Sequence, residues 1–236
     1  MTDIPIIYED NHLLVVEKPV NVPVQADRSR DRDVLNELKR FLVKKYNKPG
    51  NAYLGLVHRL DRPVGGAMIF AKTSKAASRL SNQLRLHQIE RHYLTVVAGH
   101  FRQKSATLID YLYKDRQTNT SYVVQPRHKQ AKKAILHYQV LVETDGKSLL
   151  KVTLETGRSH QIRVQLANSK HPIIGDQKYG AHVSRPSQQI ALWEYHISCL
   201  HPTKKKCQHF YTFPPERFPW SALNFNYQSL RKEGIS

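Results

Sequence analysis

The chain has 236 residues, which is enough to bury a hydrophobic core in one domain or in two closely packed ones. Lysine and arginine number 37 against 19 aspartate and glutamate, a formal net charge of +18, so the leading class of partner is a polyanion, and nucleic acid fits best. No apolar run approaches the roughly 20 residues that span a bilayer, and the N-terminus lacks the pattern of a signal peptide. We therefore expect a cytoplasmic protein that does not enter a membrane.

Metal-dependent chemistry has little support in the sequence. Cys199 and Cys207 are too far apart for a CxxC unit, and no second pair completes a zinc site. The 13 histidines are scattered, and there is no glycine-rich phosphate-binding loop. We expect reduced, structural thiols and a chemistry that uses side chains alone.

The first part of the chain predicts two strands and a helix. Apolar runs at residues 4–8 and 13–17 are typical of a β-hairpin or of two adjacent strands. Apolar residues then recur at helical spacing over 34–42, and Asp31 or Asp33 can cap that helix. A break follows at 48–51, before a short predicted strand at 53–57.

The same helix carries four cations, Lys39, Arg40, Lys44 and Lys45. Such charges usually form a solvated helix face. In a chain this basic, contact with nucleic acid is the alternative, and the sequence leaves both open.

Residues 58–66 read His-Arg-Leu-Asp-Arg-Pro-Val-Gly-Gly and place Asp61 between Arg59 and Arg62. Nearby fixed positive charge favours the ionised carboxylate, so Asp61 is predicted to stay an anion well below neutral pH. The proline and the paired glycines indicate a fixed loop, and the apolar run 67–71 predicts a buried strand behind it. A catalytic carboxylate and a solvated ion pair explain these residues equally well.

The remaining pattern predicts many strands and about three helices. The expected elements are a helix capped by Ser74, strands at 91–99, 106–112, 134–142, 149–154, 190–200 and 207–212, a hairpin turn at Asp145-Gly146, and a turn with Lys204, Lys205 and Lys206 at its tip. We interpret residues 113–133 as a mobile basic loop. The fold class predicted is α+β, with a mixed, mainly antiparallel β-sheet core and flanking helices.

A second informative stretch is 154–166, where a strand ends at a glycine turn and a helix begins. Ser159 is the predicted N-cap, and Arg163 follows one turn into the helix. The inward-facing residues are expected to be Ile162 and Leu166. A helix N-terminus attracts anions through its free N–H groups. We expect Arg158 or Arg163 to contact either Asp61 or an RNA phosphate there. Ordinary charge on the helix surface is the alternative.

Taken together, several segments resemble the RluA family of RNA pseudouridine synthases. They are 58–62, 70–73, 91–93, 97–99, 156–164 and 172–176, and the likeness runs from about residue 6 to residue 202. The resemblance implies the pseudouridine synthase fold, in a single catalytic domain over 1–236 with its core at about 4–220 and a C-terminal tail at 221–236. It also implies an isomerase that converts uridine in rRNA or tRNA to pseudouridine without cofactor or metal.

The resemblance further implies roles for single residues. Asp61 matches the catalytic aspartate, Arg163 the arginine that pairs with it, and Tyr93 the aromatic ring that stacks on the uracil. Arg59 matches the residue that fills the gap left by the extruded base, and Leu192 the apolar residue against that base. Further predicted substrate contacts are Arg62, Arg158 and His160.

The chain departs from the family pattern in two places. Val64-Gly65 stands where Thr-Ser is more usual, and Gln189, Trp193 and Glu194 replace Arg, His and Ala around Leu192. We expect no small S4-type RNA-binding domain, and residues 127–133 and 204–206 are then the candidate RNA contacts. A non-catalytic RNA-binding or ribosome-assembly factor on the same fold is the alternative. No required protein partner is evident, and a monomer is expected.

Overall fold

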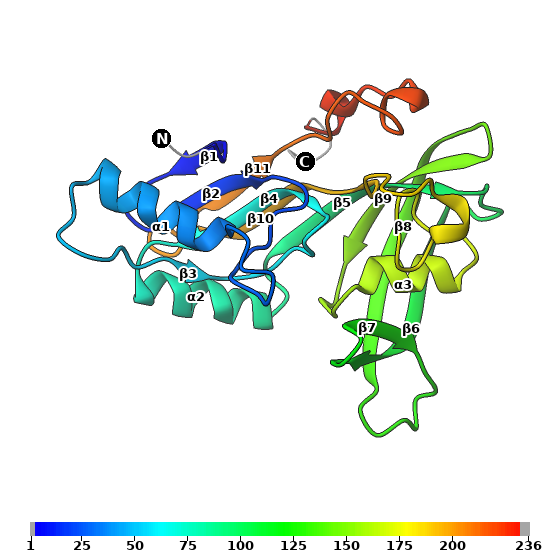
Figure 1. Ribbon diagram of the computed structural model, residues 1–236, viewed down its shortest axis with the longest axis horizontal. Helices are drawn as coiled ribbons and strands as arrows, with labels where there is room; N and C mark the ends of the chain where they lie inside the picture. The colour runs from blue at the N-terminus through cyan, green and yellow to red at the C-terminus, as the bar shows by residue number, and fades with distance from the viewer. Residues whose placement is uncertain (1–2, 232–236) are drawn as a thin grey trace. The chain divides into compact units, whose positions relative to one another are not determined.

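The computed structural model describes residues 3–231, and the chain folds into two compact units (Figure 1). Unit 1 holds Met1–Arg91 and Glu194–Thr212, and unit 2 holds His92–Trp193 and Phe213–Ser236. The predicted C-terminal tail forms two short 3-10 helices, η2 (Ser221–Leu223) and η3 (Tyr227–Arg231), and its residues 232–236 lie outside the described part. A single catalytic domain over the whole chain stays a prediction.

Unit 1 is built on antiparallel strand pairs. Its strands are β1 (Ile6–Glu9), β2 (Leu13–Lys18), β3 (Gly55–Leu56), β4 (Gly65–Ala71), β10 (Leu192–Leu200, which starts in unit 2) and β11 (Cys207–Tyr211). They follow the order β1-β2-β4-β10, with β3 beside β4 and β11 beside β10. The predicted pairing of the first two strands is confirmed, because β1 and β2 run antiparallel.

Two helices belong to unit 1, α1 (Val34–Lys45) and α2 (Ser74–Arg85). The Asp33 side chain accepts a hydrogen bond from the Asn36 backbone N–H, which confirms one of the two predicted caps. The cap predicted for α2 is wrong by one residue. Thr73 is extended and its hydroxyl accepts from the Ala76 N–H, whereas Ser74 is already helical.

The core of unit 1 lies directly behind the loop that carries Asp61. All seven residues of β4 are buried, and apolar side chains of α2 pack on them, including Ala76 and Leu80. Cys199 is buried in the same cluster, and Cys207 is exposed; both thiols are free. Burial on this scale holds the start of β4 in place, and the loop that leads into it is therefore held at one end.

Unit 2 is an antiparallel sheet with one α-helix against it. Its strands are β5 (Glu90–Ala98, which starts in unit 1), β6 (Ser105–Asp115), β7 (Thr120–Val123), β8 (Lys132–Thr144) and β9 (Lys147–Leu154), in the order β5-β9-β8-β6-β7. The predicted hairpin turn at Asp145-Gly146 is confirmed, and both residues have positive φ. Helix α3 (Gln161–Asn168) contacts β6 and β7, and a short 3-10 helix, η1 (Ala181–Val183), follows it.

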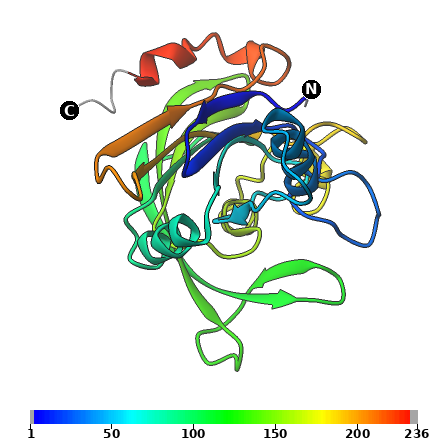
Figure 2. The same cartoon turned by 90° about the vertical axis from the view of Figure 1, so that its left-hand side faces the viewer.

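The mobile basic loop predicted at 113–133 is wrong over much of its length. Strand β6 continues to Asp115, and β7 returns beside it, so that the two form a hairpin that projects from the rest of unit 2 (Figures 1 and 2). The Asp115 carboxylate closes the turn by accepting from the Gln117 N–H and the Thr118 hydroxyl. Backbone pairing and this local turn form a hairpin where the polar composition indicated a loop.

The α+β prediction is confirmed, since a mixed, mainly antiparallel strand arrangement occurs with three α-helices over residues 3–231. Over the same residues, none of the helices has the length and apolar character that a membrane crossing requires.

Candidate active site

Asp61 lies on the loop that joins β3 to β4, as the sequence predicts. The Val64 N–H donates to the Asp61 carbonyl oxygen at 3.0 Å and closes a tight turn. Leu60 is buried, Asp61 is half-buried, and Arg59 is exposed. The backbone of the loop is therefore anchored in the core, and the side chains of Arg59 and Asp61 lie at the surface of unit 1.

Lys18 holds the backbone of this loop, a task that was not predicted from the sequence. Its side chain is fully buried, and its ammonium donates to the backbone oxygens of Pro19 (2.9 Å), Arg62 (3.0 Å) and Val64 (2.6 Å). Burial lowers the pKa of Lys18 to about 7, while the charge of Asp61 raises it and that of Arg62 lowers it. A buried ammonium needs such acceptors, so the cluster fixes the turn around Asp61. A lysine that ends an apolar strand directly before a proline was the available signal.

Arg62 turns toward an earlier segment of unit 1. Its guanidinium donates to the Asn21 carbonyl oxygen (3.2 Å) and the Ser29 hydroxyl (3.2 Å), forms an ion pair with Asp31, and lies 3.9 Å from the Asp27 carboxylate. These contacts tie the Asp61 loop to residues 21–31. They give Arg62 a structural task, and its predicted contact with the substrate stays a prediction.

His58 starts the loop as a buried, neutral imidazole. Its Nε2 accepts from the Ile69 N–H at 3.2 Å, which assigns the proton to Nδ1, and Nδ1 lies 3.8 Å from the Glu194 carboxylate. Burial lowers the pKa of His58 to about 3, and the positive charge of Arg91 acts in the same direction. The backbones of Gly66 and Glu194 also lie close together. A Cβ on Gly66 would lie 2.3 Å from the Glu194 carbonyl oxygen, and Gly66 has φ +126°, so glycine is required.

In unit 2, Arg163 forms a buried, bidentate pair with Asp176. Its Nε and Nη2 donate to the two carboxylate oxygens of Asp176, each at 2.8 Å, and its guanidinium lies 5.2 Å from the ring centre of Tyr179. Burial raises the pKa of Asp176, but Arg163 and the N–H groups of Lys178 and Tyr179 outweigh it, so the pKa lies below its ordinary value. Asp176 was part of a motif in the sequence, but its task was missed. The predicted pairing of Arg163 with Asp61 stays a prediction.

The helix that carries Arg163 begins differently from the prediction. Ser159 is not the cap; the N-cap is His160, in a left-handed conformation (φ 54°) without a side-chain cap bond. The side chain of Gln161 takes over the local bonding, since its Oε1 accepts from the Thr156 hydroxyl (2.8 Å) and the Arg158 N–H (2.9 Å). The prediction of Ser159 as the cap failed because the side chains of Thr156 and Gln161, outside the cap position, form the hydrogen bonds of this turn. The inward positions of Ile162 and Leu166 are confirmed by their burial.

The other predicted residues of unit 2 are held by the surrounding structure. His160 Nδ1 is 2.7 Å from the Tyr179 hydroxyl, and exposed Arg158 donates to the Lys133 carbonyl oxygen at 2.9 Å. Buried Tyr93 lies on β5, and buried Leu192 starts β10. The residue before Leu192 accepts hydrogen bonds from the Val96 N–H (3.0 Å) and the Thr95 hydroxyl (2.8 Å), so Leu192 lies beside the strand that carries Tyr93.

The predicted site residues thus fall into two groups. Unit 1 positions Asp61, Arg59 and Arg62; unit 2 positions Tyr93, Arg158, His160, Arg163 and Leu192. Among residues 3–231, His, Cys, Asp and Glu side chains form no group of three that could hold a metal ion.

Comparison with known proteins decides the family. A family model described as RNA pseudouridylate synthase matches residues 12–168, more than half of the chain. The chain belongs to the RNA pseudouridylate synthase family. The family resemblance expected from the motifs is therefore confirmed. The match includes Asp61, Arg59, Tyr93 and Arg163 and leaves Leu192 outside.

Curated relatives of this pseudouridylate synthase family cover most of the chain. The ribosomal large subunit pseudouridine synthase D of Salmonella typhimurium is 35% identical over 210 residues, and that of Escherichia coli K12 is 33% identical; each match covers 88% of this chain and 61% of the relative. An uncharacterized RNA pseudouridine synthase of Bacillus subtilis, YhcT, is 32% identical over 203 residues and is covered to 65%. The chain therefore spans less than two thirds of the length of these relatives.

Two solved structures share the pseudouridylate synthase fold. The human RNA pseudouridylate synthase domain containing 1 superposes with a TM-score of 0.75 at 21% identity, covering 98% of this chain and 94% of that one. The human RNA pseudouridylate synthase domain containing 4 superposes with a TM-score of 0.73 at 21% identity, covering 89% of this chain and 88% of that one. At this identity the likeness shows the fold, and the predicted pseudouridine synthase fold is confirmed.

Proposed function

We propose that this protein is an RNA pseudouridine synthase that isomerises uridine in RNA, with Asp61 as its catalytic residue. The observation that carries the proposal is the Asp61 loop of a family member, in which the buried ammonium of Lys18 fixes the backbone at Arg62 and Val64, directly after the half-buried Asp61 carboxylate. Such preorganisation is what a catalytic group requires.

The proposed reaction is an isomerisation in which nothing is added or removed overall. The bond from ribose C1′ to uracil N1 breaks, a bond from C1′ to C5 forms, C5 loses a proton and N1 gains one. Because atoms and electrons balance within the nucleotide, the scheme needs no oxidant or reductant. A carboxylate at Asp61 can begin it by attacking the sugar, by attacking the base, or by abstracting a ribose proton, and the proposal leaves these three routes open.

Extrusion of the target nucleotide precedes the chemistry, because an enzyme cannot turn a base within a stack. We assign Tyr93 to stacking on the uracil, a contact worth about 1–3 kcal/mol in nucleic-acid sites, and Leu192 to apolar contact with it. Arg59 fills the gap that the base leaves. Its exposed guanidinium has no ion-pair or hydrogen-bond partner within residues 3–231, which suits this task. Arg163 pairs with Asp61 and keeps its carboxylate charged and aimed.

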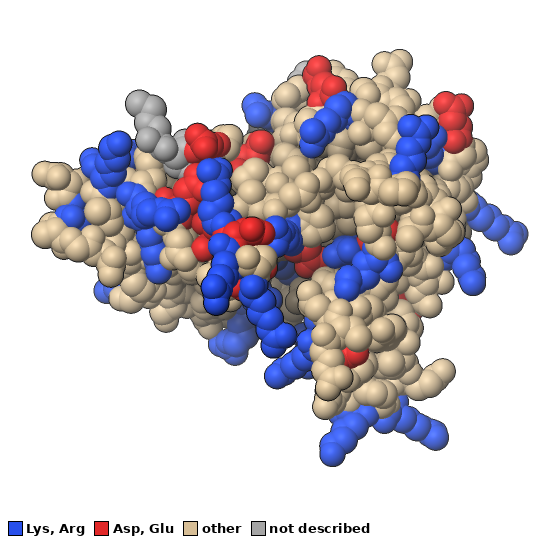
Figure 3. Space-filling model, in the orientation of Figure 1, with Lys and Arg blue, Asp and Glu red and all other residues tan. Residues whose placement is uncertain are grey.

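Further contacts with RNA are proposed for Arg158, His160 and Arg62, the last mainly through the position of its loop. The chain's charge of +18 supports RNA as the partner, and Lys and Arg side chains are spread over the face shown in Figure 3. The names of the curated relatives favour large-subunit rRNA over tRNA as the substrate. The protein is expected to act as a monomer in the cytoplasm.

Tritium release tests the proposal. Purified protein is incubated with transcripts that carry tritium at uracil C5, and the wild type is expected to release tritium to water whereas Asp61→Asn releases none above background. Asp145→Asn is the matched control, because it also removes one carboxylate but keeps an Asn-Gly turn that tolerates positive φ.

Two outcomes would count against the assignment. Equal release by wild type and Asp61→Asn would overturn Asp61 as the catalytic residue. Tight RNA binding by a wild type that releases no tritium from any cellular RNA would favour the alternative, a non-catalytic RNA-binding or ribosome-assembly factor.

A further inference from the structure

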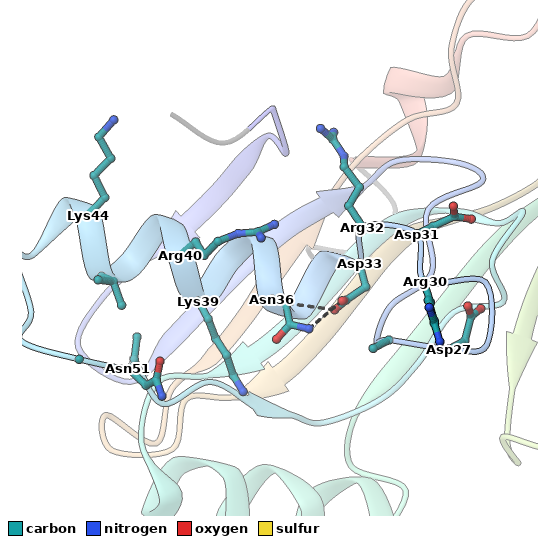
Figure 4. A pocket seen from close by; sticks show the side chains of 14 residues that line it. Asp27, Arg30, Asp31, Arg32, Asp33, Asn36, Lys39, Arg40, Lys44 and Asn51 are labelled. Atoms are coloured by element: carbon teal, nitrogen blue, oxygen red, sulfur yellow. Dashed lines mark hydrogen bonds between the residues drawn. The ribbon is translucent and has the colours of Figure 1, made fainter.

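One face of α1 forms the wall of a pocket in unit 1 (Figure 4). The helix residues that line it are Asn36, Lys39, Arg40, Val43 and Lys44, which are spaced as one helical face. The opposite face of α1 buries Val34, Leu38 and Leu42 in the core. The remaining lining residues are Ala26, Asp27, Arg30, Asp31, Arg32, Asp33, Gly50, Asn51 and Ala52. The polar face of this helix is therefore one side of a concave site.

The carboxylates of the pocket already have partners. Asp33 accepts from the Asn36 N–H at 3.0 Å as the cap of α1, and Asp31 is paired with Arg62. Asp27 accepts from the Ser29 N–H (2.9 Å) and hydroxyl (2.6 Å). These carboxylates are therefore held by other groups, and over residues 3–231 none of them forms an ion pair with Lys39, Arg40 or Lys44.

The cations on α1 are not compensated in this way. Lys39, Arg40 and Lys44, with Arg30 across the pocket, have no ion pair or side-chain hydrogen bond to any residue in the described range 3–231. Figure 4 shows Lys39 and Asn51 toward one end of the site, while Asp27 and Asp31 lie at the other. A negatively charged ligand is therefore favoured at the α1 end and disfavoured at the end with the carboxylates.

We propose that this pocket binds backbone phosphates of the RNA substrate, outside the nucleotide that reacts. Lysine and arginine side chains are the usual phosphate contacts in nucleic-acid complexes, and several unpaired cations on one concave surface suit a chain of phosphates. This inference rests on the proposed function for the identity of the RNA. Of the two explanations of the α1 cations, a solvated helix face and contact with nucleic acid, the proposal adopts the second.

The pocket is in direct contact with the catalytic loop. Arg62, the residue after Asp61, bonds Ser29 and Asp31 of the segment that forms the second wall. Phosphates held in the pocket therefore belong to nucleotides near the target uridine. The pocket sets where the RNA strand lies relative to Asp61, and its cations act on binding and not on the chemical step.

The test compares two variants that lose the same charge. The first is Lys39→Gln/Arg40→Gln/Lys44→Gln. The control is Lys75→Gln/Arg102→Gln/Lys170→Gln, three exposed cations outside the pocket that have no side-chain partner within the described chain. Fluorescence anisotropy measures the binding of labelled transcripts of large-subunit rRNA from about 0.05 to about 0.5 M salt. Circular dichroism checks that both variants fold.

Three lost contacts to a single strand, each worth about 0.7 in the slope of log K against log salt, should lower the slope by about 2. Over the decade between 0.1 M salt and the 1 M reference, this slope change lowers the affinity at 0.1 M roughly 100-fold. The control variant should bind as the wild type does. In tritium release, the pocket variant should show a raised KM with kcat changed far less.

Three results would overturn the proposal. Equal losses in the two variants would show a general charge effect, and wild-type binding by the pocket variant would show a solvated helix face. Loss of inorganic phosphate binding at constant ionic strength, with RNA binding unchanged, would show a small-anion site. A wild type that binds RNA but releases no tritium would refute the proposed function and leave the pocket testable by binding.

Discussion

Replacement of Asp176 by asparagine tests the buried pair on which Arg163 depends. The carboxylate is 1% exposed and accepts from Arg163 Nε and Nη2, each at 2.8 Å, and from two backbone N–H groups. Asparagine keeps the shape but turns an NH2 group toward the guanidinium, so one hydrogen bond becomes a contact between two donors. A buried charge that loses its partner typically costs about 3–5 kcal/mol. For a chain of this length, that cost lowers the Tm by roughly 6 to 20 °C.

Urea unfolding followed by circular dichroism measures this cost, and a double-mutant cycle isolates the pair. Asp176→Leu and Arg163→Met each leave one group uncompensated, whereas the double variant removes both charges, so its loss should be smaller than the sum of the single losses by several kcal/mol, of the order of the cost of a broken buried pair. Tritium release by Asp176→Asn should fall as well, because Arg163 is the proposed partner of Asp61. A loss of unfolding free energy below about 1 kcal/mol in Asp176→Asn, with no coupling in the cycle, would refute the reasoning.

Two further predictions concern the Asp61 loop. Lys18→Met leaves the carbonyl oxygens of Pro19, Arg62 and Val64 without their donor, so the free energy of unfolding should fall by about 2 to 4 kcal/mol, and the Val64 amide should exchange its hydrogen faster; unchanged exchange would show that Lys18 does not hold the turn. His58 has a pKa of about 3 in the folded protein and about 6.5 when unfolded, so below pH 6.5 the unfolded state takes up a proton that the native state refuses. The contribution of His58 to the free energy of unfolding should therefore be fully present above pH 6.5 and fall by about 1.4 kcal/mol per pH unit as pH drops toward 3. This component should be missing in His58→Gln, and parallel pH profiles of the two proteins would contradict the burial argument.

Local patterns predicted most elements because their causes are local. The apolar spacing over 34–42 and the Asp33 side chain specify α1, and an Asp-Gly pair specifies the turn between β8 and β9. At β7, where a loop was predicted, distant partners decided the result. Ser121 of β7 donates its hydroxyl to the Ser159 carbonyl oxygen and its N–H to the Tyr179 hydroxyl, so long-range contacts order a segment that its polar composition marked as a loop.

The residues of the candidate site show the same division. Asp61 and Arg163 could be found from the sequence, because each stands in a stretch of unusual residues whose combination resembles a family. Asp176 and Lys18 could not be assigned their tasks, because a hydrogen bond between residues 13 or 46 positions apart leaves no local pattern. The sequence likewise leaves two explanations of the α1 cations open, because the pocket that Lys39, Arg40 and Lys44 line forms only in the folded chain.

The sequence by itself determined the fold class, the family and the loop that carries Asp61, since apolar periodicity, turn residues and motif order are all written along the chain. The tertiary structure alone decided which groups hold that loop and which cations remain without partners. The physical reason is that burial and charge compensation depend on residues that meet only after folding. Lys18 beneath the turn, Arg62 on Asp31, and the unpaired cations of α1 are all results of that meeting.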